Sequence, residues 1–185
     1  MTNSISELQR IYQEAECLLD WSQIQHGLKE LAIEITGDYQ QKMPVLLCVM
    51  NGGLVFSGQL LPLLSFPLEV AYCHATRYRG KESGSDLEWK VAPSTPLKDR
   101  HVLILDDILD EGHTLLALID ACHQQGAASV ASSVLLDKQH NRKATPGLVA
   151  DYCKLTIPDR YVFGCGMDYR GYWRNAAGIF AVKGL

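Results

Sequence analysis

Residues Val102–Leu115 have the sequence VLILDDILDEGHTL, and this segment is the clearest indication of the fold class. Its four leading apolar residues predict a strand that is buried on both faces of a parallel sheet. Two adjacent carboxylates, Asp106 and Asp107, follow the strand, and a turn at Gly112 leads into an apolar segment with helical spacing. A strand, a polar loop and a helix in this order are typical of an α/β fold, in which ligands bind beyond the carboxyl ends of the strands.

The loop of this unit combines two kinds of binding group. A turn that opens a helix presents free backbone N–H groups and the positive end of the helix dipole, which suit a phosphate. Adjacent carboxylates suit the vicinal hydroxyls of a sugar, although an isolated Asp-Asp pair more often only caps a turn. The combination predicts a site for a ribose 5-phosphate. Its candidate residues are Asp106, Asp107, Asp110, Glu111, Gly112, His113 and Thr114.

The same alternation of strands and helices extends along the chain. Helical periodicity predicts helices over 4–19, 24–37 and 115–125, with a further helical segment after Asn51-Gly52-Gly53. Apolar runs predict strands over 45–49, 68–73, 102–105, 130–136, 152–157 and 179–182. Residues 77–90, which are rich in charge and glycine, predict a mobile hairpin or loop. The pattern therefore predicts one α/β domain over 1–185, with a mostly parallel central sheet flanked by helices.

Composition argues against several other classes of protein. Seventeen Lys and Arg against 21 Asp and Glu give a net charge of -4, whereas a general nucleic-acid binder needs a basic face. The most apolar stretch, 54–72, contains Gln59, Glu69 and two prolines, so no membrane span is expected, and the N-terminus shows no export leader. Six scattered cysteines without a Cys-x-x-Cys pair predict reduced thiols in a cytoplasmic protein.

The string over 102–115 resembles the phosphoribosyl-diphosphate-binding signature of type I phosphoribosyltransferases. From residue 45 to 174 the chain is similar to the hypoxanthine-guanine phosphoribosyltransferases. Three further segments support this: VMNGG at 49–53, VLLDK at 134–138, and the stretch 157–174, which contains IPDRYVFG, MDY and YWR. The resemblance implies the type I phosphoribosyltransferase fold, with a small hood formed by the chain ends, to which the N-terminal helices within 1–40 contribute.

The resemblance also implies a role for each matching residue. Diphosphate would bind Asn51, Gly52 and Arg174, the first two through a backbone that often contains a cis peptide. The purine would bind Lys138, Tyr161, Val162 and Asp168. Mg²⁺ would be held by Asp168 together with Asp106 and Asp107. Arg77 and Tyr78 would belong to a mobile loop that closes over the site. Asp110 would be the catalytic carboxylate, near N7 of the purine.

Lys138 explains the choice of base in physical terms. An ammonium group has only hydrogen-bond donors, so it can pair with the 6-oxo group of hypoxanthine or guanine, and it would oppose the 6-amino group of adenine. The resemblance therefore implies purine salvage, in which phosphoribosyl is transferred from phosphoribosyl diphosphate to N9 of a 6-oxopurine. The expected partners are these two substrates and further copies of the chain, in a homodimer or homotetramer.

Four positions depart from the pattern of the family. Asn51 stands where many relatives have a basic residue, and Glu111 replaces a threonine of the phosphate loop, so we expect its carboxylate to point away from phosphate. His113 and the Arg77-Tyr78 pair are also atypical. Two alternatives remain open: a regulatory nucleotide-binding protein that keeps the fold without catalysis, and a relative that prefers xanthine.

Overall fold

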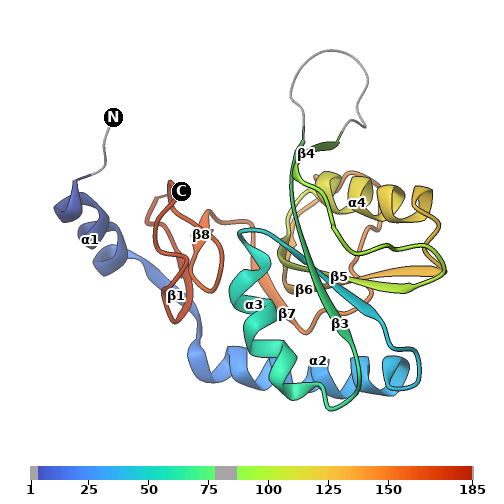
Figure 1. Cartoon of the computed structure of the whole chain (residues 1–185). Coiled ribbons are helices and arrows are strands. Elements are labelled where there is room, and N and C mark those ends of the chain that lie inside the picture. Colours follow the sequence, from blue (N-terminus) through green and yellow to red (C-terminus); the bar gives the residue numbers. More distant parts are fainter. Residues whose placement is uncertain (1–3, 78–86, 185) are drawn as a thin grey trace.

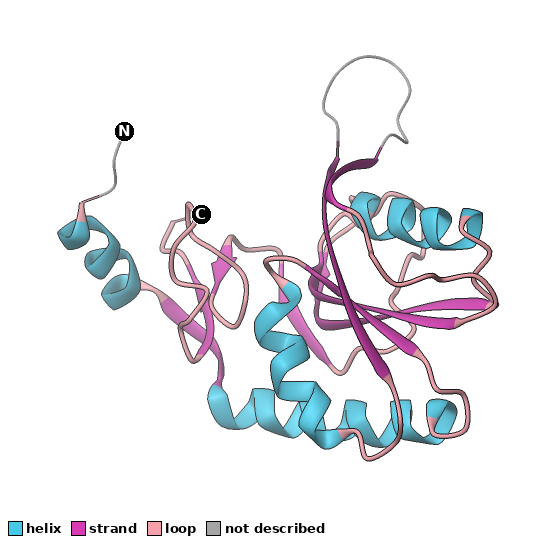
Figure 2. Ribbon diagram, viewed as in Figure 1, coloured by secondary structure: helices cyan, strands magenta, loops and turns pink. Residues whose placement is uncertain are grey.

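The computed structural model of the chain describes residues 4–77 and 87–184. A twisted sheet forms the centre of this part of the chain (Figures 1 and 2). Its strands are β2 (Val45–Val49), β3 (Glu69–Arg77), β4 (Leu87–Val91), β5 (His101–Leu109), β6 (Ser129–Gln139) and β7 (Leu155–Pro158). They lie in the order β4-β3-β2-β5-β6-β7, and every neighbouring pair is parallel except β3 with β4.

Helices cover both faces of the large sheet. Helices α2 (Trp21–Tyr39) and α3 (Gly53–Leu60), followed by the short 3-10 turn η1 (Leu61–Leu63), pack on one face against side chains such as Leu46 and Leu103. Helix α4 (His113–Gln124) packs on the other face, against Leu47 and Ile104 (Figure 1). Neighbouring residues of one strand thus enter different cores, which is why the central strands are apolar without alternation.

Both ends of the described chain meet in a second, smaller sheet (Figure 1). Strands β1 (Glu16–Asp20), β9 (Gly178–Ala181) and β8 (Val162–Phe163) pair antiparallel in this order. Helix α1 (Ile5–Glu14) packs beside them, with Leu8 in one cluster with Phe163 and Val182. The predicted fold class, a mostly parallel sheet flanked by helices with a hood at the chain ends, is confirmed.

The first predicted helix, over 4–19, is wrong in its last five residues. Ser4 Oγ accepts the backbone N–H of Glu7 and caps the helix as expected, but the helix ends at Glu14. Residues 16–20 form β1, because their backbone pairs with β9 some 160 residues later in the chain. A new helix then starts after Asp20, whose side chain and that of Gln23 form a reciprocal capping box.

Several strand boundaries also differ from the prediction, those of β3, β5, β6 and β7 among them. Strand β5 does not end at Leu105 but continues through both aspartates to Leu109, since residues 106 to 109 keep pairing with β6. Strand β7 begins at Leu155, and of the residues before it Tyr152 makes only an isolated bridge to Ser133. The longer β5 carries the acidic residues beyond the body of the sheet.

The order of the strands places the candidate site. The chain leaves β2 through α3 toward β3 on one side, and leaves β5 through α4 toward β6 on the other. The loops that follow β2 and β5 therefore lie side by side where the winding direction reverses. This is the position at which open α/β sheets bind their ligands.

Candidate active site

The loop after β2 is packed tightly against the acidic end of β5. Its Met50–Asn51 peptide is cis, as the resemblance implies. A Cβ on Gly52 would lie 2.2 Å from an oxygen of Asp107, and a Cβ on Gly166, whose φ is +112°, would lie 2.1 Å from the carbonyl oxygen of Gly52. Position 166 requires glycine, and a larger residue at 52 would displace the Asp107 side chain, so the loop's backbone comes directly beside the carboxylates.

Asp106 and Asp107 are half-buried, and a hydrogen bond links the two residues. The backbone N–H of Asp107 donates to Oδ1 of Asp106 over 2.9 Å. Burial raises the pKa of both carboxyls, and for Asp106 the nearby charge of Asp107 raises the pKa further. For Asp107 the charge of Arg174 acts in the opposite direction without reversing the shift. Two carboxylates held this close together are a site that a cation or sugar hydroxyls would stabilise.

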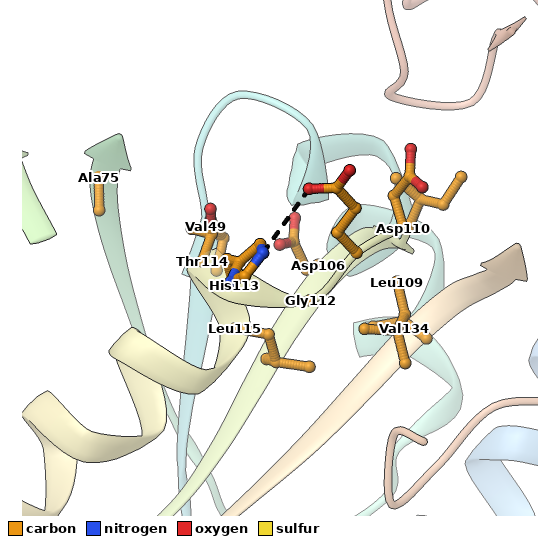
Figure 3. Close-up of a pocket in the computed structure, with 12 residues that line it drawn as sticks. Val49, Ala75, Asp106, Leu109, Asp110, Gly112, His113, Thr114, Leu115 and Val134 are labelled. Atoms are coloured by element: carbon orange, nitrogen blue, oxygen red, sulfur yellow. Dashed lines mark ion pairs between the residues drawn. The ribbon is translucent and has the colours of Figure 1, made fainter. Parts of the chain in front are cut away.

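A cavity of about 490 Å³ lies above the start of α4 (Figure 3). Gly112 forms the turn in the left-handed conformation, with φ at +87°, and the first residues of α4 follow it. The N-terminal N–H groups of the helix thus open beside the cavity. The structure gathers six of the seven predicted ribose-phosphate residues on its walls: Asp106, Asp110, Glu111, Gly112, His113 and Thr114.

Glu111 differs from the expectation that it points away. It lines the cavity, and its carboxylate lies 3.7 Å from Nε2 of His113, the ion pair dashed in Figure 3. The two atypical residues of the phosphate loop thus face each other. The pairing with His113 keeps the Glu111 carboxylate beside the phosphate loop, so it does not turn outward as expected.

A second cavity of about 230 Å³ adjoins the C-terminal segment. Its walls include the predicted purine-binding residues Lys138, Tyr161, Val162 and Asp168, together with Asp107 and Asp110. Lys138, near the end of β6, is buried, whereas the ring of Tyr161 is exposed and lies edge-on to Tyr169. Val162 starts β8, so its main chain is held by pairing with β9. The cavity offers an aromatic face, a cation and backbone groups, which suit a flat heterocycle.

Asp110 lies on the walls of both cavities and accepts a hydrogen bond at each of its oxygens. Lys138 Nζ lies 2.7 Å from Oδ2, and His140 Nε2 lies 2.7 Å from Oδ1. Partial burial acts to raise the pKa of Asp110, but the hydrogen bonds from Lys138 and His140, together with the charge of Lys138, outweigh it, so the pKa lies below its ordinary value. Asp110 is therefore ionised. Its side chain is held by two donors, Lys138 in β6 and His140 directly after β6.

His140 and Lys143 are site residues that sequence reasoning missed. The ammonium group of Lys143 donates to the carbonyl oxygens of Leu109 and Asp110 and pairs with Asp137, each over 2.7 to 2.8 Å. Both residues belong to the segment that follows β6 and folds back over the loop after β5. The signal available in the sequence was the concentration of basic side chains at 138–143, directly after the strand that neighbours the acidic one.

Asp168 and Arg174 form an ion pair at the rim of the smaller cavity. The other guanidinium nitrogen of Arg174 donates to the carbonyl oxygen of Gly166, and the backbone N–H of Gly171 donates to Oδ2 of Asp168 over 2.6 Å. Sequence reasoning assigned these two residues to metal and diphosphate. In the structure they are neighbours, and each is the other's partner.

The two residues assigned to the mobile loop, Arg77 and Tyr78, fall at or beyond the edge of the described residues. Tyr78 lies outside them, and Arg77 is the last residue of β3, where only the backbone is described. Over 4–77 and 87–184, no group of three or more His, Cys, Asp or Glu side chains is arranged to hold a metal ion. The carboxylates beside the cavities are instead separate: Asp106 and Asp107 form one pair, and Asp168 lies apart from them.

Comparison with known proteins identifies the family. Residues 14–170 match the model of the phosphoribosyl transferase domain. The chain belongs to this family. The hypoxanthine-guanine-xanthine phosphoribosyltransferase of Tritrichomonas foetus is 33% identical to it over 182 residues, which cover 98% of this chain and 96% of the relative. The hypoxanthine-guanine phosphoribosyltransferase of Streptococcus pneumoniae is 33% identical over 167 residues, covering 90% and 92% of the two chains.

A solved structure of a phosphoribosyltransferase agrees with the fold described above. The crystal structure of a hypoxanthine phosphoribosyltransferase from Staphylococcus aureus superposes with a TM-score of 0.87 and 30% sequence identity, over 99% of this chain and 97% of that one. All six cysteines of this phosphoribosyltransferase are free thiols, and four of them are buried. None of its described helices combines the length and apolar character needed to cross a membrane.

Proposed function

We propose that this protein transfers the 5-phosphoribosyl group of phosphoribosyl diphosphate to N9 of hypoxanthine or guanine, giving IMP or GMP and diphosphate. The observation that carries the proposal is the position of Asp110, which lies on the walls of both the phosphate-loop cavity and the aromatic cavity. A sugar phosphate in the first and a purine in the second would meet beside this carboxylate. Family membership and the names of the relatives support the same activity.

The residues of the larger cavity fit the phosphoribosyl group. The backbone N–H groups around Gly112 and Thr114 would bind the 5-phosphate at the N-terminus of α4. Asp106, aided by Asp107, would accept hydrogen bonds from the ribose hydroxyls, which would offset the cost of keeping these carboxylates partly buried. These contacts would hold C1 of the ribose near the smaller cavity.

The smaller cavity fits a 6-oxopurine. The base would stack on Tyr161, while the ammonium group of Lys138 would turn from Asp110 toward the 6-oxo group. Asp110 would then accept or hold the proton of N7 as N9 attacks C1. The bond from C1 to diphosphate breaks through an oxocarbenium-like state, so the main task of the protein is to position both groups and stabilise the leaving diphosphate.

Diphosphate would be received by the loop at Asn51–Gly52 and by Arg174, whose guanidinium group can bind phosphate oxygens in a bidentate manner. Asp168 and, separately, the pair Asp106–Asp107 would supply carboxylate ligands to Mg²⁺, which prefers oxygen ligands and is commonly bound by one or two carboxylates together with substrate phosphates. When bound, Mg²⁺ supplies positive charge that offsets the charge developing on the leaving group. The burial that raises the pKa values of Asp106 and Asp107 supports this fit, since a cation would stabilise their charged forms.

The proposal covers the whole protein. Residues 1–185 would act as one domain, in which the hood carries the purine-facing segment. The loop expected over 77–90 falls largely outside the described residues. We further propose that the protein is cytoplasmic and forms a homodimer or homotetramer. The exposed apolar side chains Ile33, Leu54 and Leu63, on and beside α2 and α3, support the formation of an oligomer.

The direct test incubates the purified protein with phosphoribosyl diphosphate, Mg²⁺ and each of hypoxanthine, guanine, xanthine and adenine. Nucleotide formation with the first two supports the proposal, and faster reaction with xanthine would indicate the xanthine-preferring alternative. If no purine yields a nucleotide while phosphoribosyl diphosphate still binds, the proposal is wrong and a regulatory nucleotide-binding role is favoured.

Replacing Asp168 by asparagine should weaken the binding of Mg²⁺ and diphosphate but preserve the fold. We expect kcat/KM at limiting Mg²⁺ to fall at least roughly tenfold, because loss of even an outer partner of a metal ligand typically costs ten- to hundredfold. Raising the Mg²⁺ concentration should restore part of the rate. A variant with the parent's dependence on Mg²⁺ would show that Asp168 does not hold the metal.

Replacing Glu111 by threonine should strengthen the binding of phosphoribosyl diphosphate. The substitution removes a negative charge from the cavity of the 5-phosphate and adds a hydroxyl donor. Because Glu111 is well exposed, screening limits the gain, and we expect KM to fall by about three- to fivefold. The decrease should shrink at high salt, and the surface control Glu14→Thr should leave KM unchanged. An unchanged KM in Glu111→Thr would mean that the His113 pairing already neutralises the carboxylate.

A further inference from the structure

His140 is a buried histidine whose hydrogen bonds define its protonation. Its side chain is only 3% exposed, and Nε2 lies 2.7 Å from Oδ1 of Asp110. On the other side of the ring, Nδ1 accepts the backbone N–H of Arg142 over 3.0 Å. A nitrogen that accepts a hydrogen bond carries no proton, so the geometry requires a neutral ring with its proton on Nε2, donated to Asp110.

The two donors of Asp110 differ in what they can do during the proposed reaction. Lys138 lines the cavity assigned to the purine and would leave Asp110 to pair with the 6-oxo group. His140 is held at its own Nδ1 and does not line that cavity. Once Lys138 turns to the base, His140 is the donor that keeps the Asp110 side chain in place.

The main chain around Asp110 is fixed by the same segment. Lys143 Nζ donates to the carbonyl oxygens of Leu109 and Asp110, each over 2.8 Å, and the N–H of Ala144 donates to the carbonyl oxygen of Glu111 over 2.7 Å. With the backbone clamped in this way, the remaining freedom of Asp110 is rotation of its carboxylate. The hydrogen bond from His140 removes that freedom.

We propose that His140 is a positioning residue that acts through Asp110: it anchors Oδ1, so that Oδ2 faces the purine when Lys138 binds the base. The inference rests on the proposed transferase activity. A neutral imidazole suits the task, because it orients the carboxylate without adding a second full positive charge that would make Asp110 a weaker base. Other charged groups near Asp110 are Lys138, Lys143, Arg142, Glu111 and Asp107.

The test compares two substitutions of His140. In His140→Leu the ring is replaced by a side chain without a donor, and we expect kcat to fall roughly ten- to hundredfold, the cost of a misplaced catalytic group. KM for phosphoribosyl diphosphate should stay within about twofold, because the phosphate contacts are separate. In His140→Gln the amide can donate to Oδ1 and accept from Arg142, so most of the rate should return.

The pH profile distinguishes positioning from a general loss of structure. The hydrogen bond from His140 helps to lower the pKa of Asp110, so its removal should raise that pKa. If Asp110 must be ionised to act as a base, the acidic limb of log(kcat/KM) moves to higher pH in His140→Leu and moves less in His140→Gln. His101→Leu is the matched control, since His101 bonds Ser129 at the opposite end of β5, and its profile should be that of the parent.

Long-range ¹H–¹⁵N correlations in labelled protein provide a readout that does not depend on activity, and they should place the His140 proton on Nε2. A proton on Nδ1, or a kcat for His140→Leu equal to that of the parent, would overturn the inference. So would a Gln variant as slow as the Leu variant when both melt at the parent's temperature. These results differ from failure of the proposed function, in which the parent itself forms no nucleotide.

Discussion

Replacing Asp110 by asparagine is expected to lower kcat by about ten- to ten-thousandfold, with the larger losses typical of a general acid–base group. The amide has nearly the shape of the carboxylate but cannot accept the proton of the purine. The binding of phosphoribosyl diphosphate should change much less, because Asp106 and the N-terminus of α4 provide the contacts of the sugar phosphate. The measurement is kcat with saturating hypoxanthine, together with the Kd for phosphoribosyl diphosphate.

The contacts of Asp110 add a second expectation. Its two oxygens receive donors from Lys138 and His140, and an asparagine offers only one oxygen to the two of them. One donor therefore loses its partner, which costs about 1–3 kcal/mol of unfolding free energy. Kinetics should be measured well below the melting temperature, with the exposed Asp120→Asn on α4 as the control. Equal losses in Kd and kcat would indicate a structural role in the phosphate loop.

The central α/β unit could be predicted from the sequence because its pattern is local. The apolar run at 102–105 and the turn at Gly112 locate β5 and α4, though not their exact bounds, without reference to the rest of the chain. Strand β1 could not be predicted in the same way. Leu18 and Leu19 continue a helical spacing, and only the distant β9 makes the extended conformation favourable. Pairing across the whole chain overrides a local preference here.

The candidate site shows the same division between local and distant information. Motif matches brought Asp110, Lys138 and Asp168 onto the list, and these residues line one cavity. No sequence motif identifies His140, because its contact with Asp110 depends on a loop that folds back after β6. The ion pair between Asp168 and Arg174 also follows from the turn over 169–173, which brings two residues six positions apart together.

Replacing Lys138 by glutamine should change the choice of base more than any other substitution. With hypoxanthine and guanine as substrates, the charged donor to the 6-oxo group becomes a neutral one, a loss on the order of 1–2 kcal/mol, so kcat/KM should fall about five- to thirtyfold. For adenine the amide can flip and present its oxygen to the 6-amino group, which removes the clash of donors. Because rejection by unpaired polar groups can be strong, we expect the ratio of kcat/KM for hypoxanthine over adenine to shrink by about hundredfold.

The ratio is the right quantity because Lys138 has two partners. Its substitution also removes a donor from Asp110, and that loss slows the reaction with every purine by a similar factor. Dividing the two values of kcat/KM cancels this common factor and leaves the contact with the 6-position. Lys154→Gln is the matched control, since Lys154 pairs with Glu34 away from both cavities and its loss should leave the ratio unchanged. If Lys138→Gln slows both bases equally, Lys138 serves Asp110 alone and the purine is recognised by other groups, with Tyr161 and the main chain at Val162 the remaining candidates in that cavity.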